Sequence, residues 1–272
     1  MTNAQSVRTA REKAAQLRAE AERDRARRRS TLVTAVVAVV AVLVVGAVVA
    51  VQQFRHDATV AAASAPSGVP RNTLADGGIV GVFPGATAVP AGAQPVTVEL
   101  WEDFQCPACR AFEAAQHATL ERWAQQGVVR IVYKPVAFLD RASTTQYSSR
   151  ALAAAAAVAD SSPQAFPAFH DLLYAHQPVE GSAGLTDAQL VQYATQAGAS
   201  GQDVAAALAS GRYAGWVVQR TEDFSTRLTS TPTVLVDGTV LPSDDPDAVL
   251  SAAALRRAVA TAAAAHGLPA PN

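Results

Sequence analysis

The pattern of hydrophobic and polar positions begins with one long apolar run. From Leu32 to Val51 no charged residue occurs, and a helix of this length reaches about 30 Å, the thickness of a bilayer core. Buried helices of soluble domains normally show a polar face, and this run shows none. We therefore predict a transmembrane helix over residues 31–52.

Further along, short apolar runs alternate with helical patterns. Val96 to Trp101 and Val128 to Lys134 have strand character, whereas Cys106 to Gln126 has helical character and is followed by Gly127, a residue typical of helix ends. The order strand, helix, strand predicts a βαβ unit with a right-handed crossover.

A helical block follows, which we predict from about residue 143 to 228. Three pairs of residues mark helix starts within it, either by capping-box spacing or by a proline in the first turn. These pairs are Ser143 with Gln146, Thr186 with Gln189, and Ser162 with Pro163.

The chain then returns to strand character. The apolar run Thr233 to Val236 is followed by Asp237-Gly238, a strong hairpin signal, and a last helix is expected from Asp245 to about Gly267. The whole order predicts an α/β sheet covered by helices, with a helical insertion.

Between the apolar run and the first strand, residues 64–95 are rich in Pro, Gly, Ala and short polar residues. This composition favours a flexible spacer, in which Ile79 to Phe83 could add an edge strand. The predicted plan has four parts. They are a basic tail (1–30), the transmembrane helix (31–52), a linker (53–90) and a folded domain (91–272).

Charge sets the expected orientation in the membrane. Arg27, Arg28 and Arg29 directly precede the apolar run, while only Arg55 follows it closely, which predicts a cytoplasmic N-terminus and an extracytoplasmic domain. Ala63-Ser64-Ala65 resembles a signal-peptidase site. We favour an uncleaved anchor because the apolar run is longer than a usual signal core and Pro66 would follow the cut.

The tail carries nine basic and four acidic residues up to position 29. Because the acids interleave with the bases, we expect a solvated helix near anionic lipid headgroups and no nucleic-acid partner. The sequence also lacks a phosphate loop and a dinucleotide-binding fingerprint, so we expect no cofactor.

The chain has only two cysteines, Cys106 and Cys109. A structural zinc site needs about four ligands, usually from two pairs, and His170 and His176 are too widely spaced for the usual paired-histidine pattern, so we expect no metal. A structural disulfide across two residues would restrain little of the unfolded chain. The spacing instead sets Cys106 at a helix N-terminus, where backbone N–H groups and the helix dipole stabilise a thiolate. Cys106 is therefore the expected nucleophile and Cys109 the shielded resolving thiol.

Two prolines accompany this pair. Pro107 suits a first helical turn, where its missing N–H costs nothing. Ala108 supplies no side-chain donor, so we expect an acidic Cys106 that does not reach the lowest known values. Thr231-Pro232 directly precedes the apolar run TVLV, and on local sequence alone a trans bond is expected there.

Taken together, WEDFQCPAC, the strand ending at Lys134-Pro135, the helical block and STPTVLVDG resemble the DsbA-like branch of the thioredoxin superfamily over about residues 79–265. The resemblance implies a thioredoxin-like fold with a helical insertion. It also implies a cis peptide bond at Pro232 beside the two cysteines, with the Thr231 backbone pairing to an extended substrate.

The sequence departs from the family at one position. A carboxylate is often buried six residues before the first cysteine, and here that residue is Leu100. Glu102 and Asp103 are near in sequence and either relay protons to Cys109 or are solvated surface acids. We favour surface acids.

We expect a membrane-anchored dithiol oxidase that introduces disulfides into exported proteins through Cys106 and Cys109. By resemblance, a quinone-linked membrane partner of the DsbB or vitamin K epoxide reductase type would reoxidise it. The alternatives are an extracytoplasmic reductase or isomerase, and a thioredoxin-like binding module without catalytic activity.

Overall fold

The computed structural model describes residues 68–87, 89, 92–241 and 251–271. All of them lie in the second of two compact units of the chain, residues 60–272. The predicted basic tail, the transmembrane helix and the candidate cleavage residues 63–65 lie outside the described residues. Within the described part, no helix is both long and apolar enough to cross a membrane.

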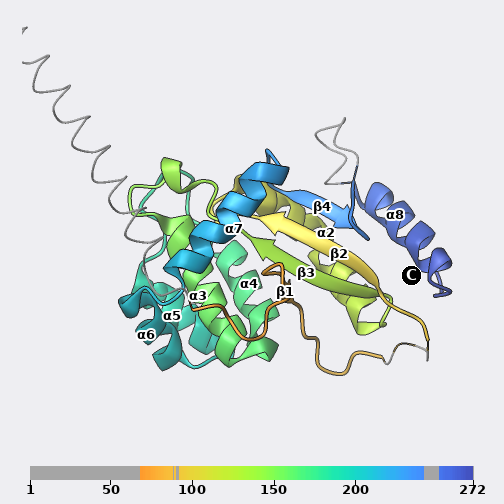
Figure 1. Cartoon of the computed structure of the whole chain (residues 1–272), viewed down its shortest axis with the longest axis horizontal. Helices are drawn as coiled ribbons and strands as arrows, with labels where there is room; N and C mark the ends of the chain where they lie inside the picture. The colour runs from red at the N-terminus through yellow and green to blue at the C-terminus, as the bar shows by residue number, and fades with distance from the viewer. Residues whose placement is uncertain (1–67, 88, 90–91, 242–250, 272) are drawn as a thin grey trace, which may run out of the picture. The chain divides into compact units, whose positions relative to one another are not determined.

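A mixed sheet of five strands lies at the centre of this unit, in the order β1-β3-β2-β4-β5 (Figure 1). β2 runs parallel to β3 and antiparallel to β4, while β1 pairs antiparallel with β3. The strands are β1 (Ile79–Val80), β2 (Val96–Glu102), β3 (Val129–Pro135), β4 (Thr233–Val236) and β5 (Thr239–Val240). The two strands predicted to flank a helix are confirmed to within about one residue at each end.

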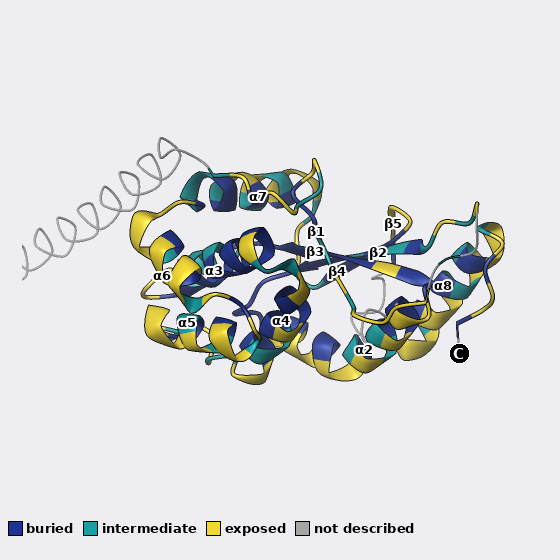
Figure 2. Ribbon diagram, turned by 90° about the horizontal axis from the view of Figure 1, so that it is seen from below, coloured by how far each residue is buried: buried dark blue, intermediate teal, exposed yellow. Residues whose placement is uncertain are grey.

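Helices cover the sheet in two ways. α2 and α8 lie on one side of the sheet and α7 lies on the other (Figure 2). α3 to α6 gather at the end of the sheet towards which β2 and β3 run (Figure 1). The α-helices are α2 (Pro107–Gln125), α3 (Tyr147–Ser161), α4 (Phe166–Ala175), α5 (Asp187–Gln196), α6 (Gly201–Ser210), α7 (Ala214–Arg227) and α8 (Ala252–Ala265). The predicted helical insertion is thus confirmed as α3 to α7.

The burial pattern of strand β2 shows why helices pack on both faces of the sheet. Val98 and Leu100 are buried on the face that carries the main apolar core, whereas Thr97 and Glu99 on the opposite face are only half-buried. Towards its end β2 is buried on both faces, because Trp101 packs against Phe224 of α7. Side chains at this end of β2 are therefore enclosed by helices.

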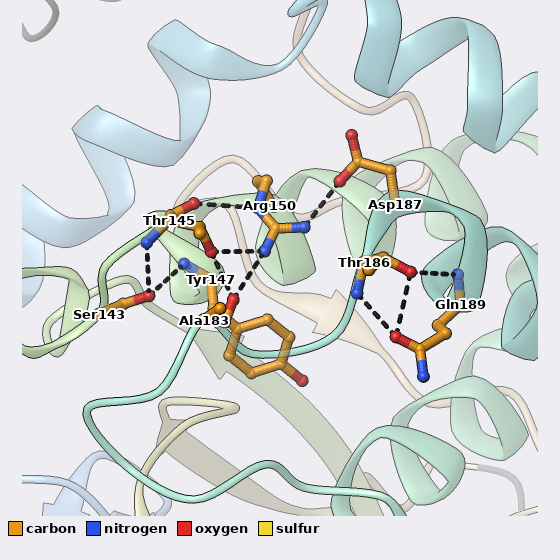
Figure 3. A network of polar contacts seen from close by, with 8 residues as sticks. All are labelled: Ser143, Thr145, Tyr147, Arg150, Ala183, Thr186, Asp187 and Gln189. Atoms are coloured by element: carbon orange, nitrogen blue, oxygen red, sulfur yellow. Dashed lines mark hydrogen bonds and ion pairs between the residues drawn. The ribbon is translucent and has the colours of Figure 1, made fainter.

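One of the two predicted capping boxes is present. Thr186 accepts from the backbone N–H of Gln189, whose side chain accepts from the N–H of Thr186 in return (Figure 3). The prediction of a capping box at Ser143 is wrong, because α3 begins only at Tyr147, after Gln146, which adopts the left-handed conformation. The Ser143 hydroxyl instead accepts from the Tyr147 N–H at 3.0 Å, from outside the helix.

The helix start predicted at Ser162-Pro163 is confirmed as a 3₁₀ turn (Pro163–Ala165) that leads into α4. The predicted hairpin is confirmed as well. At the hairpin, Asp237 and Gly238 have φ of 46° and 77°, the positive values that a tight two-residue turn between strands requires. The predicted start of the last helix at Asp245 lies outside the described residues, and Ser251 caps α8 through the N–H of Ala254.

In the segment predicted as a flexible spacer, the described residues from 68 onward are folded onto the domain. Arg71 donates through its backbone N–H and its Nε to Asp160 Oδ1, at 2.7 and 3.0 Å. The Asp160 side chain, at the end of α3, is only 3% exposed and so needs a cationic partner. The predicted edge strand exists as β1 but is shorter than expected. The spacer prediction is therefore wrong for this part.

Candidate active site

The two cysteines lie where β2 passes into α2. Cys106 is the N-cap of the helix, Pro107 takes the first helical position, and Cys109 follows one turn later. Cys106 retains 6% exposure while Cys109 has none, and both thiols are free. Cys106 therefore keeps a little solvent access, whereas Cys109 is fully enclosed.

The surroundings of Cys106 favour its thiolate. The pKa of Cys106 is lowered to about 6, chiefly by a hydrogen bond from the Cys109 thiol, against an opposing effect of burial. The Thr231 side chain and the backbone N–H groups of Ala108 and Cys109 add further stabilisation. This arrangement uses the unpaired donors of a helix N-terminus.

The pKa of Cys109 shifts in the opposite direction. Burial raises the pKa of this thiol well above its ordinary value, and the hydrogen bond to Cys106 and the charges of Cys106 and Glu102 raise it further. At neutral pH one thiolate therefore forms at Cys106 while Cys109 keeps its proton.

The second predicted motif lies beside the first. The Thr231-Pro232 peptide bond is cis, as the resemblance implies and contrary to what the local sequence favours. The Cys106 thiol donates to the Thr231 carbonyl oxygen at 3.4 Å, across 125 positions of the chain. β4 begins directly after Pro232 and pairs with β2, which brings the two motifs together.

Glu102 and Asp103 are not surface acids, and the interpretation that we favoured is wrong. They are 1% and 0% exposed, because helices of the insertion close over the end of β2. Burial raises the pKa of Glu102 to about 8, and its Oε2 lies 3.0 Å from Nε2 of His170. Burial near the thiols is what a relay to Cys109 would require, and that role stays a prediction.

Asp103 supports the loop that leads to Cys106. One of its carboxylate oxygens accepts from the Gln105 N–H at 2.8 Å and the Ser148 hydroxyl at 2.7 Å, and the other from the Leu139 N–H at 2.8 Å. Its carbonyl accepts from the Cys106 N–H at 2.9 Å. Burial nevertheless raises the pKa of Asp103 to about 6.

Gln177 is a neighbour of the site that the sequence did not reveal. Its Nε2 donates to the Cys106 carbonyl oxygen at 2.8 Å, from just beyond the end of α4. An open groove of about 540 Å³ lies beside it, with Val179, 80% exposed, on its rim. No motif marks these positions, because they reach Cys106 only through the packing of α4 against α2.

Residues with metal-ligand atoms gather behind the cysteines, between α2 and α4. Among the described residues, Glu102, Glu113 and His170 offer ligand atoms within 4.8 Å of one another, and so do Glu113, His117 and Asp171. Neither group contains a cysteine.

Comparison with known proteins agrees with this geometry. A family profile described as Thioredoxin matches residues 90–258. The reduced DsbG structure from Mycobacterium tuberculosis is 33% identical, with a TM-score of 0.56, covering 71% of this chain and 95% of that one. Reduced DsbA from the same organism is 32% identical, with a TM-score of 0.54 and coverages of 68% and 98%.

A more distant structure shares the fold alone. Oxidised BdbD from Bacillus subtilis is 20% identical, with a TM-score of 0.56, and covers 71% of this chain and 96% of that one. Among curated protein sequences, none matches the chain. The family profile, the relatives at about one-third identity and the paired thiols agree, and the chain belongs to the thioredoxin family as a DsbA-like thiol-disulfide oxidoreductase.

Proposed function

We propose that this oxidoreductase works as a dithiol oxidase, which introduces disulfides into exported proteins from a membrane anchor. The observation that carries the proposal is the contrast between the two thiols. The pKa of Cys106 is lowered to about 6 while that of buried Cys109 is raised. A stabilised thiolate favours the reduced enzyme and so makes its disulfide a better oxidant.

The reaction begins with the Cys106–Cys109 disulfide. A substrate thiolate attacks Cys106 Sγ, the bond between the two enzyme sulfurs breaks, and Cys109 leaves and takes up a proton. A second substrate thiolate then attacks the substrate sulfur of the mixed disulfide, and Cys106 leaves as its stabilised thiolate. Two electrons pass from the substrate dithiol to the enzyme, and the substrate gains one disulfide.

The surroundings of the cysteines suit a protein substrate. Thr231 stands beside Cys106, two residues before β4, so its backbone can pair with an extended chain. The apolar rim at Val179 lies on the side of Gln177, where the flanking side chains of such a segment can pack.

The proposed location rests on the sequence. Three arginines before the apolar run of residues 31–52 favour a cytoplasmic N-terminus, with the catalytic domain outside. By family resemblance, the reduced pair passes its electrons to a quinone-linked membrane partner of the DsbB or vitamin K epoxide reductase type.

The test is oxidation of a reduced, unfolded protein substrate by the full-length oxidised chain. We expect stoichiometric disulfide formation, which Cys106→Ser abolishes while the circular dichroism spectrum is unchanged. A chain that binds the substrate without oxidising it would be a binding module. Faster reduction or rearrangement of an existing disulfide than oxidation of a dithiol would favour a reductase or isomerase.

A further inference from the structure

Four side chains behind the active site converge from two helices. Glu113 and His117 stand one turn apart on α2, and His170 and Asp171 are neighbours on α4. His117 Nδ1 lies 3.4 Å from Glu113 Oε2 and 3.2 Å from Asp171 Oδ1. His170 Nδ1 lies 3.9 Å from the same Glu113 oxygen and 3.7 Å from the same Asp171 oxygen.

The separations at His117 match those between neighbouring ligands of a small divalent ion. Zinc binds nitrogen and carboxylate oxygen at about 2.0–2.2 Å, so neighbouring ligand atoms in a tetrahedral site are about 3.3–3.6 Å apart. The two separations of His117 Nδ1, 3.2 and 3.4 Å, are close to this range, whereas the two of His170 Nδ1, 3.7 and 3.9 Å, are longer. Glu113, His117 and Asp171 therefore form the core of the cluster, and the His170 ring would have to move closer to reach the same ion.

Both histidines are oriented with Nδ1 towards the cluster. His170 Nε2 lies 3.0 Å from Glu102 Oε2, and His117 Nε2 lies 3.4 Å from Glu121 Oε2. When the ring proton sits on Nε2 and is donated to the neighbouring carboxylate, the lone pair of Nδ1 is left for a metal, the usual support of metal-binding histidines.

An independent observation points to a missing partner. The His170 side chain is 1% exposed, and its Nδ1 has no hydrogen-bond partner. The Oε1 atom of Glu113 is also buried without a partner. Buried polar atoms are nearly always satisfied by protein, water or an ion.

We propose that Glu113, His117, His170 and Asp171 bind one divalent first-row transition ion, with Zn²⁺ as the best match. Two imidazoles and two carboxylates suit zinc, whereas calcium and magnesium prefer an all-oxygen set. The site is separate from the thiols, and it runs counter to the expectation of no metal drawn from the sequence. The half-exposed His117 and Asp171 give the ion access from solvent. The bound ion ties the active-site helix α2 to α4.

The experiment is calorimetric titration of the full-length chain with Zn²⁺ after Cys106 and Cys109 have been oxidised to a disulfide, so that no thiolate competes. We expect one ion per chain. His117→Gln and Asp171→Asn should each weaken binding at least about tenfold, since loss of an outer partner alone costs roughly 10- to 100-fold. Both side chains are partly exposed, so these variants should fold.

Two matched controls come from the same chain. His176→Gln changes an exposed histidine directly after α4, and Glu222→Gln an exposed acid on α7, and both should bind Zn²⁺ as the unchanged chain does. Co²⁺ in place of Zn²⁺ should give the visible bands of a four-coordinate ion without a thiolate charge-transfer band. The proposal would be overturned if the oxidised chain did not bind Zn²⁺. It would also be overturned if His117→Gln and Asp171→Asn bound Zn²⁺ as tightly as the unchanged chain does.

Discussion

At the residue scale, the chemistry depends on two thiols of the same type in different surroundings. Cys106 sits at the open end of α2 among N–H donors and the Thr231 side chain, whereas Cys109 lies one turn inward with no exposure. The same hydrogen bond between them lowers the pKa of the first thiol and raises that of the second. Only one of the two sulfurs is therefore prepared to react with a substrate.

The lowered pKa can be measured directly. In the reduced chain, the rate of Cys106 alkylation by iodoacetamide should rise with pH through a midpoint at about 6, because the thiolate is the nucleophile. Cys109 should stay unmodified across the same range. A midpoint near 9, the ordinary value for the thiol, would mean that the helix start does not stabilise this sulfur.

The division of roles predicts a trapped intermediate. Cys109→Ser should accumulate mixed disulfides between Cys106 and exported proteins, because no second enzyme thiol remains to release them. Nonreducing electrophoresis of cells that express the variant reads this out, with the Cys106→Ser, Cys109→Ser double variant as control. Equal adducts in the control would show that Cys106 is not the attachment point.

Asp103 is predicted to act through the loop before Cys106. Asp103→Asn should lower the free energy of unfolding by about 1–3 kcal/mol, because an amide cannot accept all three of the hydrogen bonds made by the two carboxylate oxygens. Urea unfolding measures this loss, with the exposed Asp187→Asn as matched control. Equal stability of the two variants would contradict the role given to Asp103.

At the element scale, local signals predicted the elements well where the chain itself supplies the hydrogen bonds. The Thr186 capping box and the Asp237-Gly238 turn are present because each is completed within a few residues. Ser143 has the same spacing but caps from outside α3, since Gln146 turns into the left-handed region. The difference comes from how the preceding loop packs, which spacing does not record.

The Thr186 box gives a test at this scale. Thr186→Ala should destabilise the protein by about 1 kcal/mol, the usual cost of losing an N-cap, and should leave thiol exchange unchanged. Thermal or denaturant unfolding checks this. Thr119→Ala, within α2, is the control, because alanine at a helix interior costs nothing. If Thr186→Ala is as stable as the control, the cap contributes nothing to α5.

At the scale of the whole molecule, the sequence located the reacting atoms but not what encloses them. The cysteines and Thr231-Pro232 were identified as motifs, and pairing of β2 with β4 brings them together. The local sequence predicts Glu102 and Asp103 to be surface acids, because the helices that bury them come much later in the chain. Gln177 and His170 have no local signal for the same reason.

The equilibrium reduction potential of the Cys106–Cys109 pair tests the central claim, that thiolate stabilisation makes this disulfide an oxidant. The full-length chain is equilibrated in glutathione buffers at pH 7 and its two redox states are quantified. The pKa of Cys106, about 6, lies between the pKa of the reactive cysteine in thioredoxin, about 7, and that in the strongly oxidising DsbA, about 3.5. The reduction potentials of those two proteins are about −270 and −120 mV. The account predicts a potential between these two values. A potential at or below about −270 mV would contradict it.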